Sequence, residues 1–332
     1  MSSEVIDIRR LAADDFSALL DAEGRAWSEH LRWDYAPAAR VIRACLSDRR
    51  LNGYALVNGG SVEGYSFYVC ENDKGLIGDC FMADPAAGSG KVFRLLGHVL
   101  ETLMAWPGVR RIESQLPHFS AETLEPCFTR HGFRTYLRRF MLLNLNGSHA
   151  EIPDSVAASA TLRSGQFVIE PWERKHDQQA VDLICQAYRG HIDAAINDQY
   201  ASASGATRLI ENIVELRGCG EQVPRASLVA IHAPTRRLAG VVALTGVRRQ
   251  TAHVPQVAVA PEFQSQGLGA ALLATAFREA VRRGYREVSL TVTDLNRDAV
   301  RFYARLGFET FRTFGAYVWN SVRNDETMND EP

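Results

Sequence analysis

The chain has 332 residues, enough for about two domains, and its 46% hydrophobic and 23% charged residues are ordinary for a folded globular protein. Lys and Arg total 37 against 39 Asp and Glu, so the formal net charge of -2 argues against a nucleic-acid binder. The six cysteines form no C-x-x-C pair and no Cys/His cluster at metal-ligand spacing, which predicts no metal site and is typical of a reducing compartment. Because no apolar run approaches the ~20 residues of a membrane span and no signal peptide is evident, we expect a cytoplasmic protein that does not associate with membranes.

The first half, residues 1–146, alternates strand-like and helical patterns. Strands are predicted over 5–11, 53–57, 62–70, 76–82 and 111–116, and helices from Asp14, over 91–106 and over 123–130. This half ends its short helix at Gly132-Phe133, and the basic residues that follow, Arg134, Arg138 and Arg139, are interpreted as a solvated strand edge. Residues 147–166 are rich in Ser, Ala and Gly and are interpreted as a linker.

The second half, residues 167–320, repeats this order before a polar tail over 321–332. Strands are predicted over 167–172, 227–233, 238–248, 251–260, 287–293 and 308–319, and helices over 177–188, 207–216, 268–283 and 296–305. Gly307-Phe308 occupies the place of Gly132-Phe133, 175 residues earlier, which indicates an internal duplication. The mixture of helices and sequential strands predicts an α/β or α+β fold.

A glycine turn between a strand and a helix carries the chemistry of the second half. A turn of this kind presents unpaired backbone N–H groups and the positive end of a helix dipole, which suit a pyrophosphate. Ala270 and Ala271 follow Gly269 where a Walker A loop needs Lys and Ser or Thr, and Leu272 stands where a dinucleotide fingerprint needs Gly or Ala. Both of those alternatives therefore fail.

The same turn, Gln264-Ser265-Gln266-Gly267-Leu268-Gly269, matches the Gln/Arg-x-x-Gly-x-Gly/Ala loop of the GNAT superfamily of N-acetyltransferases at each position. A second segment, over 287–308, resembles the later strand and helix of that superfamily, with Asn296, Ala299, Tyr303, Gly307 and Phe308 at the usual spacings. The resemblance covers roughly residues 251–310. It implies two tandem GNAT-like domains, each a mostly antiparallel twisted sheet with a splayed parallel strand pair and flanking helices.

The resemblance also implies where a cofactor would bind. Acetyl-CoA would lie between the strands around 256–260 and 288–293, and no metal would be required. Its pantetheine arm would contact the backbone of Val257, Ala258 and Val259, and its pyrophosphate the N–H groups of the loop. The loop residues concerned are Gln264, Ser265, Gln266, Gly267, Leu268, Gly269 and Ala270. Asn296 and Ala299 would line the same site, and Tyr303 would protonate the departing thiolate.

The general base is left open by the sequence. His253, Glu262 and Asp294 are all predicted near the site, a water relay is an alternative, and His253 is the preferred side chain because its ordinary pKa near 6.5 suits the task. Taken singly, Asn296 could equally be a helix cap and Tyr303 a core residue.

The first half is predicted to be degenerate, although its loop keeps a Gly-x-Gly pair. No Gln or Arg stands three residues before the first of these glycines, because Pro85 occupies that position. Phe128 stands where the second half has Tyr303, and Ala121 where it has Asn296. We therefore expect that the second half alone transfers acetyl groups, in a monomer or a homodimer.

The acceptor is predicted only as a primary amine on a small molecule or peptide. The tandem architecture is similar to that of mycothiol synthase, which acetylates a cysteinyl amine, but the residues around 188–200 provide no matching signature. The alternative function is a non-catalytic protein that binds or senses acyl-CoA.

Overall fold

The computed structural model describes residues 3–84, 89–145, 166–214 and 219–321. The predicted linker, apart from Gln166, the polar tail beyond Ser321 and part of the first-half glycine loop lie outside the described residues.

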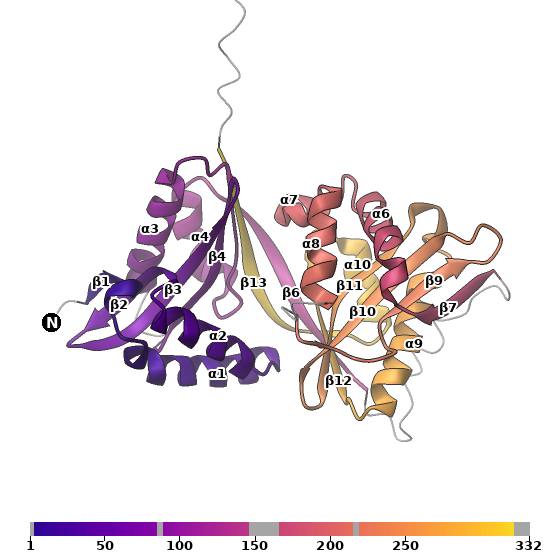
Figure 1. Ribbon diagram of the computed structural model, residues 1–332, viewed down its shortest axis with the longest axis horizontal. Coiled ribbons are helices and arrows are strands. Elements are labelled where there is room, and N and C mark those ends of the chain that lie inside the picture. The colour runs from indigo at the N-terminus through magenta and orange to yellow at the C-terminus, as the bar shows by residue number, and fades with distance from the viewer. Residues whose placement is uncertain (1–2, 85–88, 146–165, 215–218, 322–332) are drawn as a thin grey trace, which may run out of the picture. The chain divides into compact units, whose positions relative to one another are not determined.

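The strands are β1 (Glu4–Asp7), β2 (Asn52–Asn58), β3 (Ser61–Glu71), β4 (Lys74–Met82), β5 (Arg111–Gln115), β6 (Arg134–Asn144), β7 (Phe167–Pro171), β8 (Glu221–Gln222), β9 (Leu228–His232), β10 (Leu238–Arg248), β11 (Thr251–Val259), β12 (Glu287–Thr293) and β13 (Glu309–Asn320). The α-helices are α1 (Ser17–Leu31), α2 (Ala36–Ser47), α3 (Ser89–Ala105), α4 (Ala121–Arg130), α6 (Asp177–Ala187), α7 (Ile192–Ile196), α8 (Ala203–Val214), α9 (Leu268–Arg282) and α10 (Arg297–Arg305). Short 3₁₀ helices include η5 (Pro261–Phe263). This mixed α/β architecture confirms the predicted fold class (Figure 1).

The chain forms two compact units, and each contains a strand from the other half of the sequence. Unit 1 comprises residues 1–26, 35–136 and 314–332, and unit 2 comprises 27–34 and 137–313. These units differ from the expected boundaries of 1–146 and 167–320, because most of β6 belongs to unit 2 and most of β13 belongs to unit 1. The two strands follow the same Gly-Phe pair in their respective halves, so the sequence pattern does not distinguish which sheet each one joins.

In unit 1 the strand order is β1-β2-β3-β4-β5-β13. All pairings are antiparallel except that of β4 with β5, and β13 pairs with β5 from Ala316↔Gln115 to Asn320↔Arg111. The apolar faces of α3 and α4 pack on one side of this sheet, and α1 and α2 lie on the other side (Figure 1).

In unit 2 the order is β6-β12-β11-β10-β9-β7, and β8 pairs with β10. Again one pairing is parallel, that of β11 with β12. Helices α9 and α10 contribute to a core on one face, whose centre includes Leu272 and Phe277, and α6 and α8 form a second core on the opposite face. The sheet of unit 2 is therefore covered by helices on both sides.

The parallel pair is interrupted at the same point in both units. In unit 2 the pairing runs from Thr251↔Glu287 to Val254↔Leu290 and then stops, and in unit 1 it runs from Lys74↔Arg111 to Ile77↔Ser114 and stops. This shared opening supports the duplication predicted from the sequence. Among the described residues, no helix is long and apolar enough to cross a membrane.

Candidate functional site

The opening between β11 and β12 is produced by an extra residue in β11. Ala243 of β10 pairs with Gln256, but Thr245 pairs with His253, so β11 advances by one more residue than β10 does. The bulge contains Pro255, which has no backbone N–H to donate to a neighbouring strand. Before the bulge Ala252 and Val254 face the α9 core, whereas after it Ala258 and Ala260 face the α6/α8 core.

The backbone of β11 beyond the bulge points into this opening at two of the predicted positions. The N–H of Ala260 donates to the carbonyl of Ala239 in β10 at 2.9 Å. Because successive backbone groups of a strand point to opposite sides, those of Val257 and Val259 point toward the side that β12 has left. No strand among the described residues pairs with that side after Val254. The buried Ala258 side chain belongs to the core.

The predicted phosphate loop forms a tight turn that leads into α9. Ser265 and Gly267 both adopt left-handed backbone conformations, with φ of +59° and +81°. Two side-chain amides hold the turn, because Nε2 of Gln264 donates to the carbonyl of Val259 at 3.0 Å and Nε2 of Gln266 to that of Glu262 at 2.9 Å. Leu268 and Ala270 bury their side chains, so they can contact a ligand only through the backbone.

This turn leaves the N-terminus of α9 without a side-chain cap, because the capping residue is Gly267. The first N–H groups of α9 therefore remain suitable for an anion. A Cβ on Gly269 would lie 3.7 Å from Cγ2 of Val259 and 3.8 Å from Cζ of Phe302. The helix start, the end of β11 and helix α10 consequently meet at one place.

Asn296, Ala299 and Tyr303 lie on α10 or at its start. Asn296 is the N-cap, since its Oδ1 accepts a hydrogen bond from the N–H of Ala299 at 3.2 Å, and its Nδ2 lies 3.1 Å from Nε2 of His191. The ring of Tyr303 packs edge-on against Phe308, with 5.7 Å between ring centroids. Burial raises the pKa of the Tyr303 hydroxyl above its ordinary value, and Tyr188 and Asp193 raise it further.

A polar network that the sequence did not predict borders the opening. Gln256, 3% exposed, donates from Nε2 to the hydroxyl of Tyr188 at 3.1 Å and accepts at Oε1 from Tyr200 at 3.0 Å. The two tyrosine rings stack with centroids 4.0 Å apart. Desolvation raises the pKa of Tyr188 to about 12, so both this phenol and Tyr303 remain protonated at neutral pH.

An ion pair continues this network at the end of β12. Nη1 of Arg138 donates to Oδ1 of Asp193 at 3.0 Å and to the hydroxyl of Thr293 at 2.6 Å, and Thr293 also contacts Asp193. Arg138 and Asp193 expose only 13% and 16% of their side chains. The interpretation of Arg138 as part of a solvated strand edge is therefore wrong, since its β6 backbone pairs with β12 at Thr293.

His253 lies in the part of β11 that is still paired with β12. Its side chain is 8% exposed, Nδ1 is 2.9 Å from the hydroxyl of Ser289, and its ring lies 5.0 Å from that of Trp33 and 6.4 Å from that of Phe140. Burial lowers the pKa of His253 to about 4. A buried imidazole of such low basicity is better suited to a structural role than to accepting a proton from an amine.

The other two carboxylates considered as bases are also engaged elsewhere. Asp294 forms ion pairs with Arg139 and, at 3.0 Å, with Arg297. Glu262 lies on exposed η5, 3.9 Å from Arg237. Asp294 is thus buried between two guanidinium groups, whereas Glu262 is exposed and only distantly paired.

The residues missed by the sequence come from separate elements. Arg138 lies on β6, Asp193 on α7 and Gln256 on β11, so their spacings of 55 and 63 residues carry no periodic signal. Burial of polar side chains that face one another is a property of the folded chain. A sequence pattern alone therefore had no means of selecting them.

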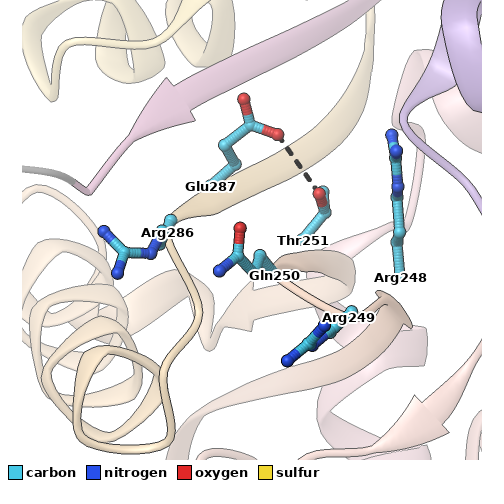
Figure 2. A pocket seen from close by; sticks show the side chains of 6 residues that line it. All are labelled: Arg248, Arg249, Gln250, Thr251, Arg286 and Glu287. Atoms are coloured by element: carbon cyan, nitrogen blue, oxygen red, sulfur yellow. Dashed lines mark hydrogen bonds between the residues drawn. The ribbon is translucent and has the colours of Figure 1, made fainter.

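A separate hollow of about 380 Å³ lies at the opposite end of the parallel pair, where β11 and β12 begin. Its lining includes Thr251, whose hydroxyl donates to Oε2 of Glu287 at 3.2 Å. Figure 2 shows the guanidinium groups of Arg248, Arg249 and Arg286 pointing in different directions around it. Because these groups do not converge and the hollow is at the wrong end of the strands, we do not assign it to the predicted site.

Comparisons with known proteins agree with this geometry. Residues 193–308 match the acetyltransferase (GNAT) family, a range that includes the opening, the glycine turn and α10. The chain is 42% identical over 62 residues to an uncharacterised N-acetyltransferase of Methanocaldococcus jannaschii. That stretch is 19% of this chain and 27% of the relative, so the similarity covers about a quarter of the relative's length.

Two solved structures resemble nearly the whole chain. A GCN5-related N-acetyltransferase from Sphaerobacter thermophilus aligns with a TM-score of 0.68 and 16% identity, covering 96% of this chain and 95% of that one. A tandem GNAT protein from the clavulanic acid biosynthesis pathway aligns with a TM-score of 0.61 and 17% identity, covering 98% of this chain and 100% of that one. At these identities the likeness establishes the fold.

Proposed function

We propose that the protein transfers the acetyl group of acetyl-CoA to a primary amine in its second half, because residues 193–308 match the acetyltransferase (GNAT) family. The observation that carries this proposal is the opening of the β11/β12 pair beside the uncapped start of α9. A thioester cofactor with a long amide-bearing arm and a pyrophosphate needs both features.

The cofactor would bind mainly through backbone groups. The arm would follow the free side of β11 at Val257 and Val259, with its amides replacing the hydrogen bonds that β12 no longer makes. The pyrophosphate would lie on the N–H groups from Gln266 to Ala270, where the helix dipole favours negative charge. Asn296 and Ala299 would border the same site from the start of α10.

The reaction we propose is a direct attack. The amine nitrogen forms a bond to the thioester carbonyl carbon, the carbon–sulfur bond breaks, and the departing thiolate takes the proton of the Tyr303 hydroxyl. The raised pKa of Tyr303 keeps its proton in place at neutral pH until a thiolate develops. The proton that the amine loses would pass to water, and water would return a proton to the Tyr303 oxygen, since His253 and Asp294 are held in other interactions and Glu262 is exposed.

Unit 1 would not perform this step. Phe128 occupies the position that corresponds to Tyr303, and it stacks on Tyr317 with centroids 3.8 Å apart instead of presenting a hydroxyl. A phenyl ring has no proton to give to a thiolate. We therefore place the transfer in the second half of the chain.

The proposal is tested by replacing Tyr303 with Phe. The Tyr303→Phe variant should lose about 10²- to 10⁴-fold in kcat, the usual contribution of a general acid, while its affinity for acetyl-CoA stays close to that of the wild type. Turnover is measured by release of the CoA thiol, and binding by calorimetry. Tyr285→Phe is the matched control, because Tyr285 lies beside Gly246, away from the opening. An unchanged rate in Tyr303→Phe would remove Tyr303 from the role of acid.

The acceptor class is tested by a screen of small amines, peptide N-termini, lysine side chains and aminoglycosides with acetyl-CoA. We expect release of free CoA with at least one amine class. Tight binding of acetyl-CoA without turnover on any class would instead indicate a protein that senses acyl-CoA.

We also propose a cytoplasmic location. All six cysteines are free thiols, and Cys80 and Cys127 are buried. Unpaired cysteines are typical of a reducing compartment. Fractionation of the native host followed by immunodetection tests this location.

A further inference from the structure

Unit 1 places a carboxylate where unit 2 has the amide of Gln256. In β4 the extra residue is Gly78, because Phe67 of β3 pairs with Asp79 whereas Tyr68 pairs with Ile77. Asp79 therefore follows the end of the parallel pairing at Ile77 by two residues, as Gln256 follows Val254. The two halves thus differ chemically at one equivalent buried position beside the opening.

Two further metal-ligating side chains meet Asp79 from other elements. Glu23 comes from α1 and His118 from the segment after β5, and one ligand atom from each of the three residues lies within 4.8 Å of the others. Glu23 is fully buried, and Asp79 and His118 are only 5% and 8% exposed. All three belong to unit 1.

The carboxylates in this cluster are partly held by hydrogen bonds. The hydroxyl of Tyr65 donates to Oε2 of Glu23 at 2.8 Å, and the N–H of Cys80 donates to Oδ1 of Asp79 at 2.7 Å. The other oxygen of Glu23, Oε1, is buried and has no hydrogen-bond partner among the described residues. Neither carboxyl forms an ion pair with Lys or Arg in the described part of the chain.

Two buried carboxyl groups without a basic partner need a positive charge or a proton. With Glu23 fully buried and Asp79 only 5% exposed, two negative charges at this place are costly unless a positive charge lies beside them. A divalent cation would neutralise both carboxylates and would also use the orphaned oxygen of Glu23. One imidazole nitrogen with two carboxylate oxygens is a ligand set suited to Zn²⁺.

We propose that unit 1 binds a divalent transition-metal ion of the Zn²⁺ class through Glu23, Asp79 and His118. The ion would connect α1, β4 and the segment after β5. Tyr65 would orient the Glu23 carboxylate by its hydrogen bond, as outer-sphere donors do in metal sites. Nothing in this proposal depends on acetyl transfer by the second half.

The test measures the metal content of the full chain. The protein is unfolded in the presence of a chelator, refolded with Zn²⁺ or with Co²⁺ as a spectroscopic probe, and freed of excess metal by gel filtration. We expect one ion per chain by elemental analysis, visible absorption from bound Co²⁺, and a higher thermal midpoint than that of protein refolded without metal. Wild-type protein with no bound metal and no shift in midpoint would overturn the proposal and leave a shared proton as the occupant.

Matched variants assign the ion to this cluster. Asp79→Asn and Glu23→Gln keep the shape of each side chain and should lose the bound ion and the Co²⁺ absorption. His176→Gln is the control, because His176 is another buried histidine near a carboxylate, 3.1 Å from Glu170. Retention of one ion by Asp79→Asn and Glu23→Gln would contradict the assignment; where a variant fails to fold, the wild-type measurements decide.

Discussion

Gly267 precedes helix α9 as its N-cap with φ of +81°, a conformation that costs most other residues roughly 1–2 kcal/mol. Gly269, two residues later, has helical geometry, and a Cβ there would make only ordinary contacts at 3.7 and 3.8 Å. The two glycines of the loop therefore differ in their roles, and only Gly267 is needed for the backbone conformation. The first permits the turn, and the second leaves the start of the helix uncovered.

Gly267→Ala should lower the free energy of unfolding by about 1–2 kcal/mol and weaken acetyl-CoA binding, because the turn must distort or carry strain. Denaturant unfolding and calorimetric titration measure the two effects. Gly269→Ala is the matched control and should be neutral or stabilising by up to ~1 kcal/mol, since alanine favours a helix. Equal stability for both variants would mean that the left-handed turn is not needed.

The low pKa of His253 predicts a pH dependence of stability. Its folded pKa of about 4 lies below the unfolded value of 6.5, so the unfolded state binds more protons between these values and stability falls as the pH decreases through that window. The full shift corresponds to about 3 kcal/mol at most. His253→Gln should flatten the stability profile between pH 4 and 6.5 relative to the wild type.

His232→Gln is the control for that profile, because His232 lies at the end of β9 with its Nδ1 bonded to Thr235. Stability is measured by urea unfolding at each pH. The structural role assigned to His253 would be untenable if acetyl transfer, rather than stability, followed this titration.

At the scale of elements, the end of β12 is joined to β6 and α7 by the interactions of Arg138 with Asp193 and Thr293. Arg138→Ala should destabilise the protein by about 3–5 kcal/mol, because it leaves the largely buried Asp193 without its cation. Arg138→Met combined with Asp193→Leu should recover much of that loss, since no charge then remains buried.

The exposed pair of Arg301 and Asp298 on α10 is the control, and its loss should cost less than about 1 kcal/mol. Unfolding in urea measures the change in the free energy of unfolding for Arg138→Ala, for the double variant and for the loss of the control pair. A similar small cost for Arg138→Ala would show that Asp193 is solvated in solution.

The elements themselves were largely predictable from sequence. The apolar stripe of α9 and the β-branched runs of β10 and β12 located those elements to within a residue or two, because periodicity reports which faces are buried. Helix α2 and the short α7 were missed. The opening could be anticipated only from the family resemblance, because the bulge around Pro255 depends on how β10 and β12 pair with β11.

For individual residues, too, the sequence indicates local motifs but not contacts between segments that are distant along the chain. Gly267, Asn296 and Tyr303 could be proposed from the sequence because they belong to local motifs. Gln256 and Asp193 were not, since their importance arises from partners distant in sequence. The proposed ligand set of Glu23, Asp79 and His118 could not be anticipated for the same reason, and the cysteine pattern offered no indication of it.

At the scale of the whole molecule, each unit depends on a strand from the other half. Unit 1 obtains Phe314–Asn320 from the end of the chain, including the fully buried Tyr317 that stacks on Phe128. A fragment of residues 1–146 lacks this strand, so β5 would lose its antiparallel partner. The duplication could be predicted from the sequence, but the exchange of β6 and β13 between the units could not. The two strands are equivalent in the two halves, so either one could complete either sheet.

We expect the fragment 1–146 to show no cooperative thermal unfolding. The same fragment with residues 314–321 attached through a Gly/Ser linker should regain a cooperative transition, because the added strand restores the pairing with β5 and the buried Tyr317. Circular dichroism and calorimetry compare the two. Cooperative unfolding of both fragments at one midpoint would show that this strand is dispensable.

The exchange of strands also sets an order of completion during synthesis. Every residue of unit 2 lies between positions 27 and 313, whereas unit 1 needs residues as late as Asn320. The chain emerges from the ribosome at about 5–20 residues per second. All the strands of unit 2 are therefore synthesised before the last strand of unit 1. The half that is translated first is the last to close its sheet, and its β5 edge stays open until residues 314–320 have been made.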